Sequence, residues 1–308
     1  MSGEFFVPIS LSPILIGVFA ALACALPGNF LLLRRQALIG DAISHVILPG
    51  IVVAFLVTGI VATGPMMAGA AAAAVLAVVL IELIRRMGQI ESGAAMGVVF
   101  TAMFAAGVLL LERSDTSSVH LDVEHALYGN IESLIWLDAT GWGSLLDPDA
   151  LAGLPPELTR IVLTFFGVCL FIAVTWRALA ISTFDEGFAR TQGIPHRALG
   201  MALVIVAAVA AVAAFDAVGS IIVIAMFICP PAAARMMTNR LGVQVAWSCV
   251  FAVCSAVLGY VLAGYGPGWI GAENAVSAAG MIATMSGVIL ALAAAFGPCR
   301  KPAGGSTE

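Results

Sequence analysis

A carboxylate and an imidazole lie four residues apart in an otherwise apolar stretch, at Asp41 and His45. In an α-helix this spacing places both side chains on one face, with their Cβ atoms about 6 Å apart. Such groups inside apolar spans are costly and mark functional sites by default. One oxygen and one nitrogen ligand suit Mn²⁺, Fe²⁺ or Zn²⁺, and no thiolate lies near in the sequence. The pair predicts a place where a divalent cation is shared or passed from one side chain to the other, and a purely structural Asp–His hydrogen bond is the alternative.

Other potential ligands lie between apolar stretches and in one long polar loop. Asp216 separates two such stretches, where it is either part of the path by which metal arrives or an ordinary turn residue. In the loop, His120, Asp122 and Glu124 would share one side of an extended chain. These three predict a low-affinity site on the same path, and a merely solvated loop is the alternative.

The composition leaves one class of fold for the elements that hold these residues. Apolar residues make up 61% of the 308-residue chain and charged residues 10%, and the mean hydropathy is +1.08. Average soluble domains contain about 25% charged residues, and a soluble fold of this length cannot bury so much apolar surface. Soluble enzymes and disordered scaffolds are therefore excluded. The net charge of −5 offers no basic surface, so no nucleic-acid partner is expected.

Stretches of about 20 predominantly apolar residues mark the membrane spans. They predict an all-α polytopic membrane helical bundle that forms a single transmembrane domain over residues 1–308, with a loop at 112–157 on one side and a loop at 182–197 on the other. About nine transmembrane helices are expected, at 11–34, 38–61, 65–85, 93–111, 158–180, 198–214, 217–235, 243–264 and 276–297.

The orientation follows from the positions of the basic residues. With the N-terminus outside, the cytoplasmic segments hold 11 of the 13 Lys and Arg residues, as the positive-inside rule requires. The loop at 112–157 then faces outward, and the loop at 182–197 lies in the cytoplasm. We expect a multi-pass protein of the inner (cytoplasmic) membrane, surrounded by the lipid bilayer, with a cytoplasmic C-terminus.

Proline and glycine predict breaks in two of the spans. Pro49 and Gly50 lie about one helical turn after His45, and Pro230 and Pro231 interrupt a late span. Proline removes a helical hydrogen bond, and irregular backbone inside a membrane is tolerated where it lines a cavity or packs on protein. We therefore predict helix breaks at these four residues.

The loop at 182–197 predicts a short amphipathic helix that cannot span the membrane. Asp185 and Glu186 suit a helix N-terminus, and Gly193 could end the helix. Such a helix on the inner face is a docking surface for a cytoplasmic partner. No Walker A pattern G-x-x-x-x-G-K-[ST] occurs in the chain, so ATP-driven transport would need a motor on another polypeptide.

Three separated motifs resemble those of the permeases of metal-ion ABC importers (ABC-3 type). Residues 33–50 are similar to the family's second-helix signature, and residues 217–234 resemble its proline-broken late helix. Residues 184–193 resemble the Phe-Asp-Pro-Glu-Phe-Ala-x-x-x-Gly loop that docks the ATPase. The departures are Glu186-Gly187 in place of Pro-Glu, and Val46 where the family mostly has Ala.

The resemblance implies the ABC-3 metal-permease fold and a set of partners. These are a second permease subunit, identical or related, two cytoplasmic ATPase subunits and an extracytoplasmic metal-binding protein. The chain itself would be no enzyme and would hold no permanent cofactor, only the transported ion. Residues 120–129 and the acid in 215–219 look closer to the manganese and iron branch than to zinc. By motif, the transient metal site is Asp41 and His45, and the ATPase-docking residues are Phe184, Asp185, Glu186, Ala189 and Gly193.

Three other functions compete with this interpretation. A secondary cation transporter driven by an ion gradient suits broken helices and a buried Asp, but it would need no ATPase-docking loop. An intramembrane metalloprotease needs H-E-x-x-H or a comparable ligand set, which the chain lacks. A purely structural membrane subunit would leave Asp41 and His45 without a role. The sequence therefore favours the ABC permease.

Overall fold

The computed structural model describes residues 6–59, 63–113, 129, 131–269, 271 and 276–299. Within these ranges all regular structure is helical. The long helices are α2 (Ser12–Leu33), α3 (Ile39–Thr58), α4 (Thr63–Gly88), α5 (Ser92–Arg113), α8 (Pro156–Phe184), α10 (His196–Met237), α11 (Leu241–Trp269) and α12 (Ala278–Phe296). The short ones are η1 (Val7–Leu11), η2 (Ile131–Ser133), η3 (Trp142–Leu146), α7 (Pro148–Ala152) and α9 (Glu186–Thr191).

Eight helices of the described chain are long and apolar enough to cross a membrane, and η1 extends the first of them. The predicted all-α membrane bundle is thus confirmed, and the expected count of about nine spans holds approximately. The difference lies in α10, whose two limbs on either side of Gly219 correspond to the two expected spans, 198–214 and 217–235.

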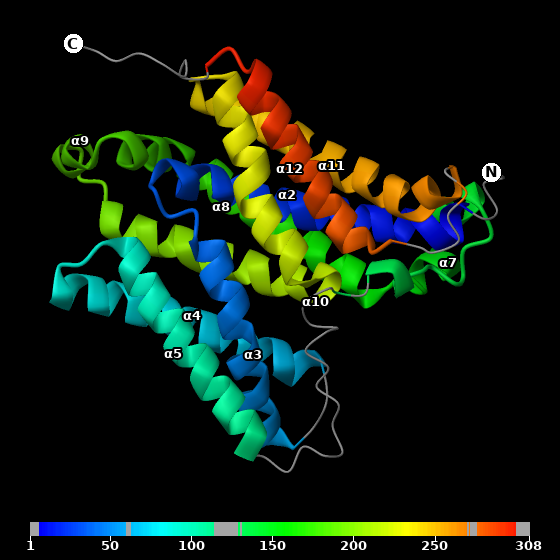
Figure 1. Ribbon diagram of the computed structural model, residues 1–308, viewed down its shortest axis with the longest axis horizontal. Helices are drawn as coiled ribbons and strands as arrows, with labels where there is room; N and C mark the ends of the chain where they lie inside the picture. The colour runs from blue at the N-terminus through cyan, green and yellow to red at the C-terminus, as the bar shows by residue number, and fades with distance from the viewer. Residues whose placement is uncertain are drawn as a thin grey trace.

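Helix α10 is bent sharply at Gly219. A straight helix of its 42 residues would be about 63 Å long, twice the thickness of the bilayer core of about 30 Å. Gly219 has φ 78° and ψ 171°, a conformation outside the helical region that glycine adopts without steric cost. The chain reverses there, so the two limbs of α10 run back toward the same end of the molecule (Figure 1).

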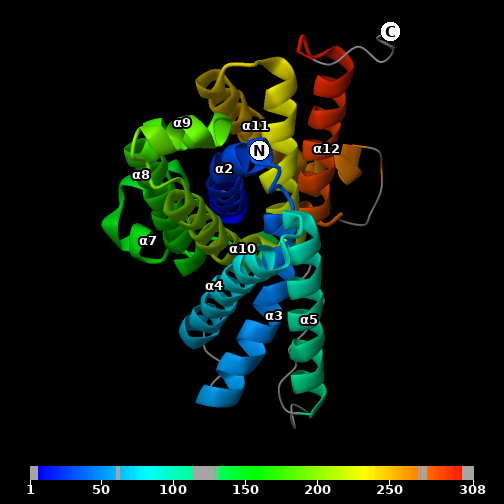
Figure 2. The same cartoon turned by 90° about the vertical axis from the view of Figure 1, so that its left-hand side faces the viewer.

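The helices form two groups that meet on α10. Helices α3, α4 and α5 lie together below α10 in both views, and α2, α8, α11 and α12 pack around its other side (Figures 1 and 2). The α2–α3 turn, the α4–α5 turn and α9 lie at the left of Figure 1, whereas α7 and the start of α2 lie at the right. One end of the molecule therefore carries two turns between spans and the short helix α9, and the opposite end carries α7 and the start of α2.

No unwound turn is seen at the four residues where helix breaks are predicted, Pro49, Gly50, Pro230 and Pro231. Helix α3 continues through Pro49 and Gly50, and α10 continues through Pro230 and Pro231. Neighbouring helices pack against these residues and offset the missing hydrogen bonds. Pro231 has no N–H to offer the Phe227 carbonyl, and α2 approaches that carbonyl so closely that a Cβ on Gly28 would lie 2.5 Å from its oxygen.

Helix α3 is held against α4 and α5 by small residues. A Cβ on Gly50 would lie 2.5 Å from the carbonyl oxygen of Gly69 in α4. A Cβ on Gly107 of α5 would lie 2.6 Å from the Cβ of Pro49. Close helix packing through small residues is the usual way in which membrane helices associate. Pro49 and Gly50 therefore fix the position of α3 rather than interrupt it.

Candidate metal site

Asp41 and His45 lie together on the first two turns of α3. The His45 Nε2 atom is 3.5 Å from Asp41 Oδ1, so the predicted shared face is confirmed. Asp41 is in the first turn, where the helix dipole stabilises a negative charge. The side chains are 43% (His45) and 35% (Asp41) exposed, although their neighbours on α3 are buried. The pair therefore faces outward from the single chain.

Two aromatic rings of α5 hold the imidazole. Phe100 stacks on His45 with ring centroids 5.2 Å apart and an angle of 20° between the planes. Phe104 meets the same ring edge-on at 5.9 Å and 79°. These contacts limit rotation of the imidazole and keep its Nε2 atom beside the carboxylate. No pattern in the sequence points to either phenylalanine, because a contact between α3 and α5 depends on the packing of the two helices.

A single chain offers few ligands at this place. Among the described residues, no group of three or more His, Cys, Asp or Glu side chains is placed to hold a metal ion. The Asp41–His45 pair can supply one carboxylate and one imidazole, and the remaining ligands would come from outside the described residues, from water or from another chain. Two ligands bind a cation weakly, which suits transient binding rather than a resident metal.

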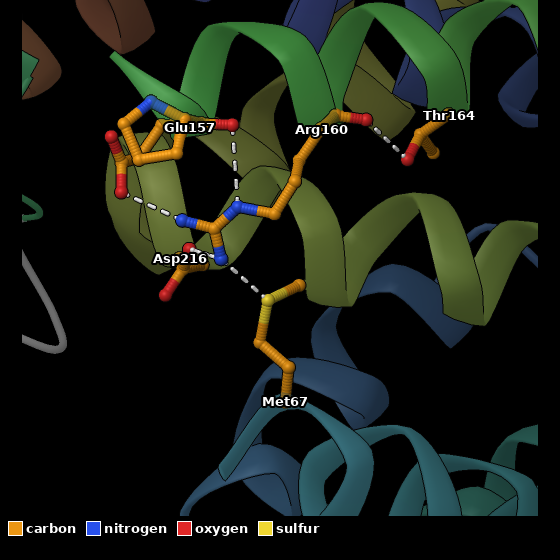
Figure 3. Close-up of polar contacts among 6 residues, drawn as sticks. Met67, Glu157, Arg160, Thr164 and Asp216 are labelled. Atoms are coloured by element: carbon orange, nitrogen blue, oxygen red, sulfur yellow. Dashed lines mark hydrogen bonds and ion pairs between the residues drawn. The ribbon is translucent and has the colours of Figure 1, made fainter. Parts of the chain in front are cut away.

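Asp216 is engaged in an ion pair. Its Oδ2 atom is 2.8 Å from Nη1 of Arg160 in α8, and Arg160 Nη2 also contacts Glu157 Oε1 at 2.6 Å (Figure 3). The same Arg160 Nη1 atom donates to the Met67 sulfur of α4 at 2.8 Å. Arg160 thus joins α4, α8 and α10 next to the bend at Gly219. Its charge offsets that of Asp216, so Asp216 attracts a cation less than the sequence implies.

The remaining loop candidates, His120, Asp122 and Glu124, lie outside the described residues, and their role on the metal path stays a prediction.

The short helix expected in the loop at 182–197 is present as α9. The Asp185 carboxylate caps it by accepting a hydrogen bond from the Phe188 N–H at 2.8 Å. Gly193 has φ +70°, and the Ile194 N–H donates to the Ala189 carbonyl at 3.0 Å, which is the glycine-closed end that the sequence predicts. Ala189 is buried, whereas Phe184 and Phe188 are 59% and 50% exposed. The end of α8 and α9 therefore each present one aromatic side chain outward.

An arginine connects the end of α8 to the turn that precedes α3. Arg34, directly after α2, donates from Nε to Thr183 Oγ1 at 3.0 Å and from Nη2 to Ser182 Oγ at 2.8 Å. Burial lowers the pKa of the Arg34 guanidinium from its usual value, and the nearby Glu186 carboxylate opposes this shift. The end of α8 and the turn that leads to Asp41 are thereby tied together. Arg34 lies within the motif at 33–50, but sequence alone did not identify its partners.

The fold and the pair on α3 define a class of protein: a multi-pass helical membrane protein with two potential cation ligands at the start of one span. The chain belongs to the ABC 3 transport family, whose sequence profile matches residues 8–138 and 151–297. The membership inferred from the three motifs is thus confirmed.

Relatives of known role align with most of the chain. The manganese transport system membrane protein MntD of Bacillus subtilis is 39% identical over 282 residues, which cover 92% of this chain and 90% of that protein. The zinc transport system membrane protein TroD of Treponema pallidum is 35% identical over 290 residues, which cover 94% and 74% respectively.

A solved structure has the same fold. The structure described as PsaBC from Streptococcus pneumoniae in complex with Fab matches with a TM-score of 0.73 at 24% identity, and the match covers 94% of this chain and 92% of that chain. The predicted ABC-3 permease architecture is therefore confirmed as a fold.

Proposed function

We propose that this protein is the permease subunit of an ABC importer that moves a divalent transition-metal ion into the cytoplasm. The observation that carries the proposal is the Asp41–His45 pair, held at 3.5 Å on α3 and facing outward from the chain. The relatives named for manganese and zinc transport support the class of cargo. We place manganese first, with iron and zinc as the other candidates, since residues 120–129 look closer to the manganese and iron branch.

The chemistry of the pair suits an ion that must bind and leave. A divalent ion that loses its water in a low-dielectric path is very costly, and a carboxylate oxygen with an imidazole nitrogen offsets part of that cost. Asp41 contributes the negative charge, and His45 is a ligand through Nε2 only when it is neutral. Because the described residues supply only two such ligands at this place, the ion is held weakly enough to be released.

A second permease subunit completes the site in this proposal. The Asp41 and His45 side chains are about two-fifths exposed in the single chain, so a partner can approach them. A partner that presents an equivalent pair would double the ligand set to two oxygens and two nitrogens. The partner is a second copy of this chain or a related chain.

The other partners follow from the two ends of the molecule. We assign the end that contains α9 to the cytoplasm, with the N-terminus outside and the C-terminus inside an inner (cytoplasmic) membrane. An extracytoplasmic metal-binding protein then delivers the ion at the opposite end. Two ATPase subunits dock on the end of α8 and on α9, through the exposed Phe184 and Phe188 respectively, and they supply the ATP hydrolysis that this chain does not perform.

A gradient-driven cation transporter is the second candidate. It shares the apolar bundle and the acid in a span, but it gives α9 no role. The Asp185 cap and the glycine-closed end stabilise α9, and Arg34 ties the adjacent end of α8 to the turn before α3. These contacts favour a helix that transmits the movement of a bound partner. Co-purification of an ATPase subunit with the wild type, and its loss on Phe188→Glu, separates the two candidates.

Asp41→Asn tests the metal site most sharply. Asparagine keeps the shape and can still hydrogen-bond to His45, but it removes the charge. We expect metal uptake to fall by at least ~10-fold, because one charged ligand contributes more than about 1.4 kcal/mol to holding a partly dehydrated cation. Asp149→Asn, which removes an exposed carboxylate in α7, is the matched control. Uptake of radioactive manganese in cells is the assay, with membrane insertion checked by blot. Near-normal uptake in Asp41→Asn cells would leave the pair as a structural hydrogen bond.

A further inference from the structure

A pocket of about 610 Å³ opens beside α9, where the two helix groups meet. Its walls come from the α2–α3 turn, the first halves of α3 and α10, the end of α4 and the end of α8. Neither Asp41 nor His45 lines it, although their neighbours Ala42 and Val46 do. The pocket is therefore distinct from the candidate metal site but shares α3 with it.

Positive charge dominates the polar part of the pocket. Five arginines line it against three glutamates: Arg34, Arg35, Arg85, Arg190 and Arg197 against Glu82, Glu91 and Glu186. Arg85 is already paired with Glu82 at 2.9 Å. Arg35 and Arg197, both exposed, form no side-chain hydrogen bond or ion pair with any described residue. Two guanidinium groups thus remain available to an anion, and a metal cation is disfavoured here.

The rest of the lining is apolar. Ile43 and Val46 of α3, Val78 of α4 and Val204 of α10 are buried residues that line the pocket, and Phe100 of α5 lies beside them. All belong to helices apolar enough to cross a membrane. The pocket is thus amphipathic, with charge toward the end of the molecule and an apolar floor between the spans.

The backbone of Arg35 supports a functional use of its side chain. Arg35 closes the end of α2 with φ +59°, a conformation that glycine adopts at lower cost. The Gln36 N–H donates to the Leu31 carbonyl at 2.8 Å, which is the bond usually made around a glycine at this place. Termination of α2 alone would favour glycine, so the arginine side chain has another use.

We propose that this pocket binds an anionic phospholipid of the inner leaflet, with the phosphate among the arginines and an acyl chain along the apolar floor. Basic pockets between membrane helices on the cytoplasmic side are suited to such headgroups. The assignment rests on the proposed orientation, which places α9 inside. An acidic segment of a soluble ATPase would match the arginines, but it would leave the apolar floor empty. The lipid matches both parts of the lining.

Bound lipid would connect the two helix groups. Its headgroup contacts α2, α9 and α10, and its chain contacts α3, α4 and α5. Because Ala42 and Val46 line the pocket, occupancy would restrict movement of the helix that bears Asp41 and His45. Lipid binding is therefore expected to stabilise the bundle.

The test measures lipid on the purified full-length protein. Native mass spectrometry compares retained phosphatidylglycerol with retained phosphatidylcholine in the wild type and in Arg35→Gln/Arg197→Gln. The matched control is Arg177→Gln/Arg240→Gln, which removes two arginines that do not line the pocket. A third variant, Val204→Phe, fills the apolar floor without changing charge. Competition with inorganic phosphate distinguishes a lipid site from a simple anion site.

We expect phosphatidylglycerol to bind roughly 30-fold more weakly to the pocket variant than to the wild type and the control, given the usual contribution of each basic residue at a membrane surface. Val204→Phe should also reduce binding, and inorganic phosphate should compete poorly. Equal retention in all variants would overturn the proposal. So would full competition by inorganic phosphate, or loss of ATPase binding with lipid retention unchanged, which would assign the pocket to the protein partner. Because lipid retention is read without transport, a failed metal assay leaves this result interpretable.

Discussion

The contact between Gly107 of α5 and Pro49 of α3 predicts that replacing glycine by alanine destabilises the protein at position 107 but not at position 97 of the same helix. A Cβ on Gly107 would lie 2.6 Å from the Pro49 Cβ and 2.8 Å from its Cα. Carbon atoms in contact prefer about 3.5–4.0 Å, so α5 must move away from α3 by about 1 Å in Gly107→Ala. A Cβ on Gly97, ten residues earlier in α5, meets nothing within 4 Å.

The expected free energies follow from these distances. Overpacking of this kind costs about 1–3 kcal/mol, and both variants gain about 0.5–1 kcal/mol from replacing glycine in a helix. Gly107→Ala should therefore be destabilised on balance, whereas Gly97→Ala should be neutral or slightly stabilised. Because Phe100 and Phe104 are on the same helix as Gly107, the shift should also loosen their contacts with His45 and reduce metal uptake.

Thermal unfolding of the purified full-length protein measures the difference. We expect the Tm of Gly107→Ala to lie roughly 5 °C below that of Gly97→Ala. Uptake of manganese in cells, normalised to the amount of protein in the membrane, reads the effect on His45. A Gly107→Ala protein as stable and as active as Gly97→Ala would refute the argument that this contact sets the distance between α3 and α5.

Three further predictions concern the topology, the hydrogen bonds of Arg34 and the Arg160–Asp216 ion pair near Gly219. In a Cys-free background, a cysteine at Asp147 should react with an external impermeant reagent and one at Gly187 should not; the reverse pattern would invert the proposed orientation. Arg34→Gln removes two charge-assisted hydrogen bonds of about 1.5 kcal/mol or more each and should lower the amount of metal taken up per ATP hydrolysed. An unchanged ratio would mean that Arg34 does not couple ATP hydrolysis to transport. Asp216→Asn and Arg160→Met should each destabilise the protein by about 1–3 kcal/mol in thermal unfolding, because each leaves one partner of the ion pair uncompensated. The double variant should lose less stability than the sum of the two single variants. Strict additivity would mean that the Arg160–Asp216 ion pair contributes nothing to stability.

The amino-acid sequence by itself determined the features that depend on neighbours along the chain. Long apolar runs predicted the spans, and four-residue spacing predicted that Asp41 and His45 share a face. Both are seen in the structure, because helical periodicity is a local property. The short helix α9 was likewise predictable, since an acid at its start and Gly193 at its end act through local hydrogen bonds.

Only the tertiary structure decided the features that join distant residues. The non-helical backbone inside α10 lies at Gly219, and Gly129, 90 residues earlier, packs so closely on the Val218–Gly219 peptide that a side chain at position 129 would overlap it. Arg160 reaches Asp216 from another helix, and Arg34 bonds to Ser182, which is 148 residues away. No periodicity records such pairings, because they depend on how whole helices pack. Local spacing therefore placed Asp41 and His45 on one face of α3, and helix packing determined what holds them there.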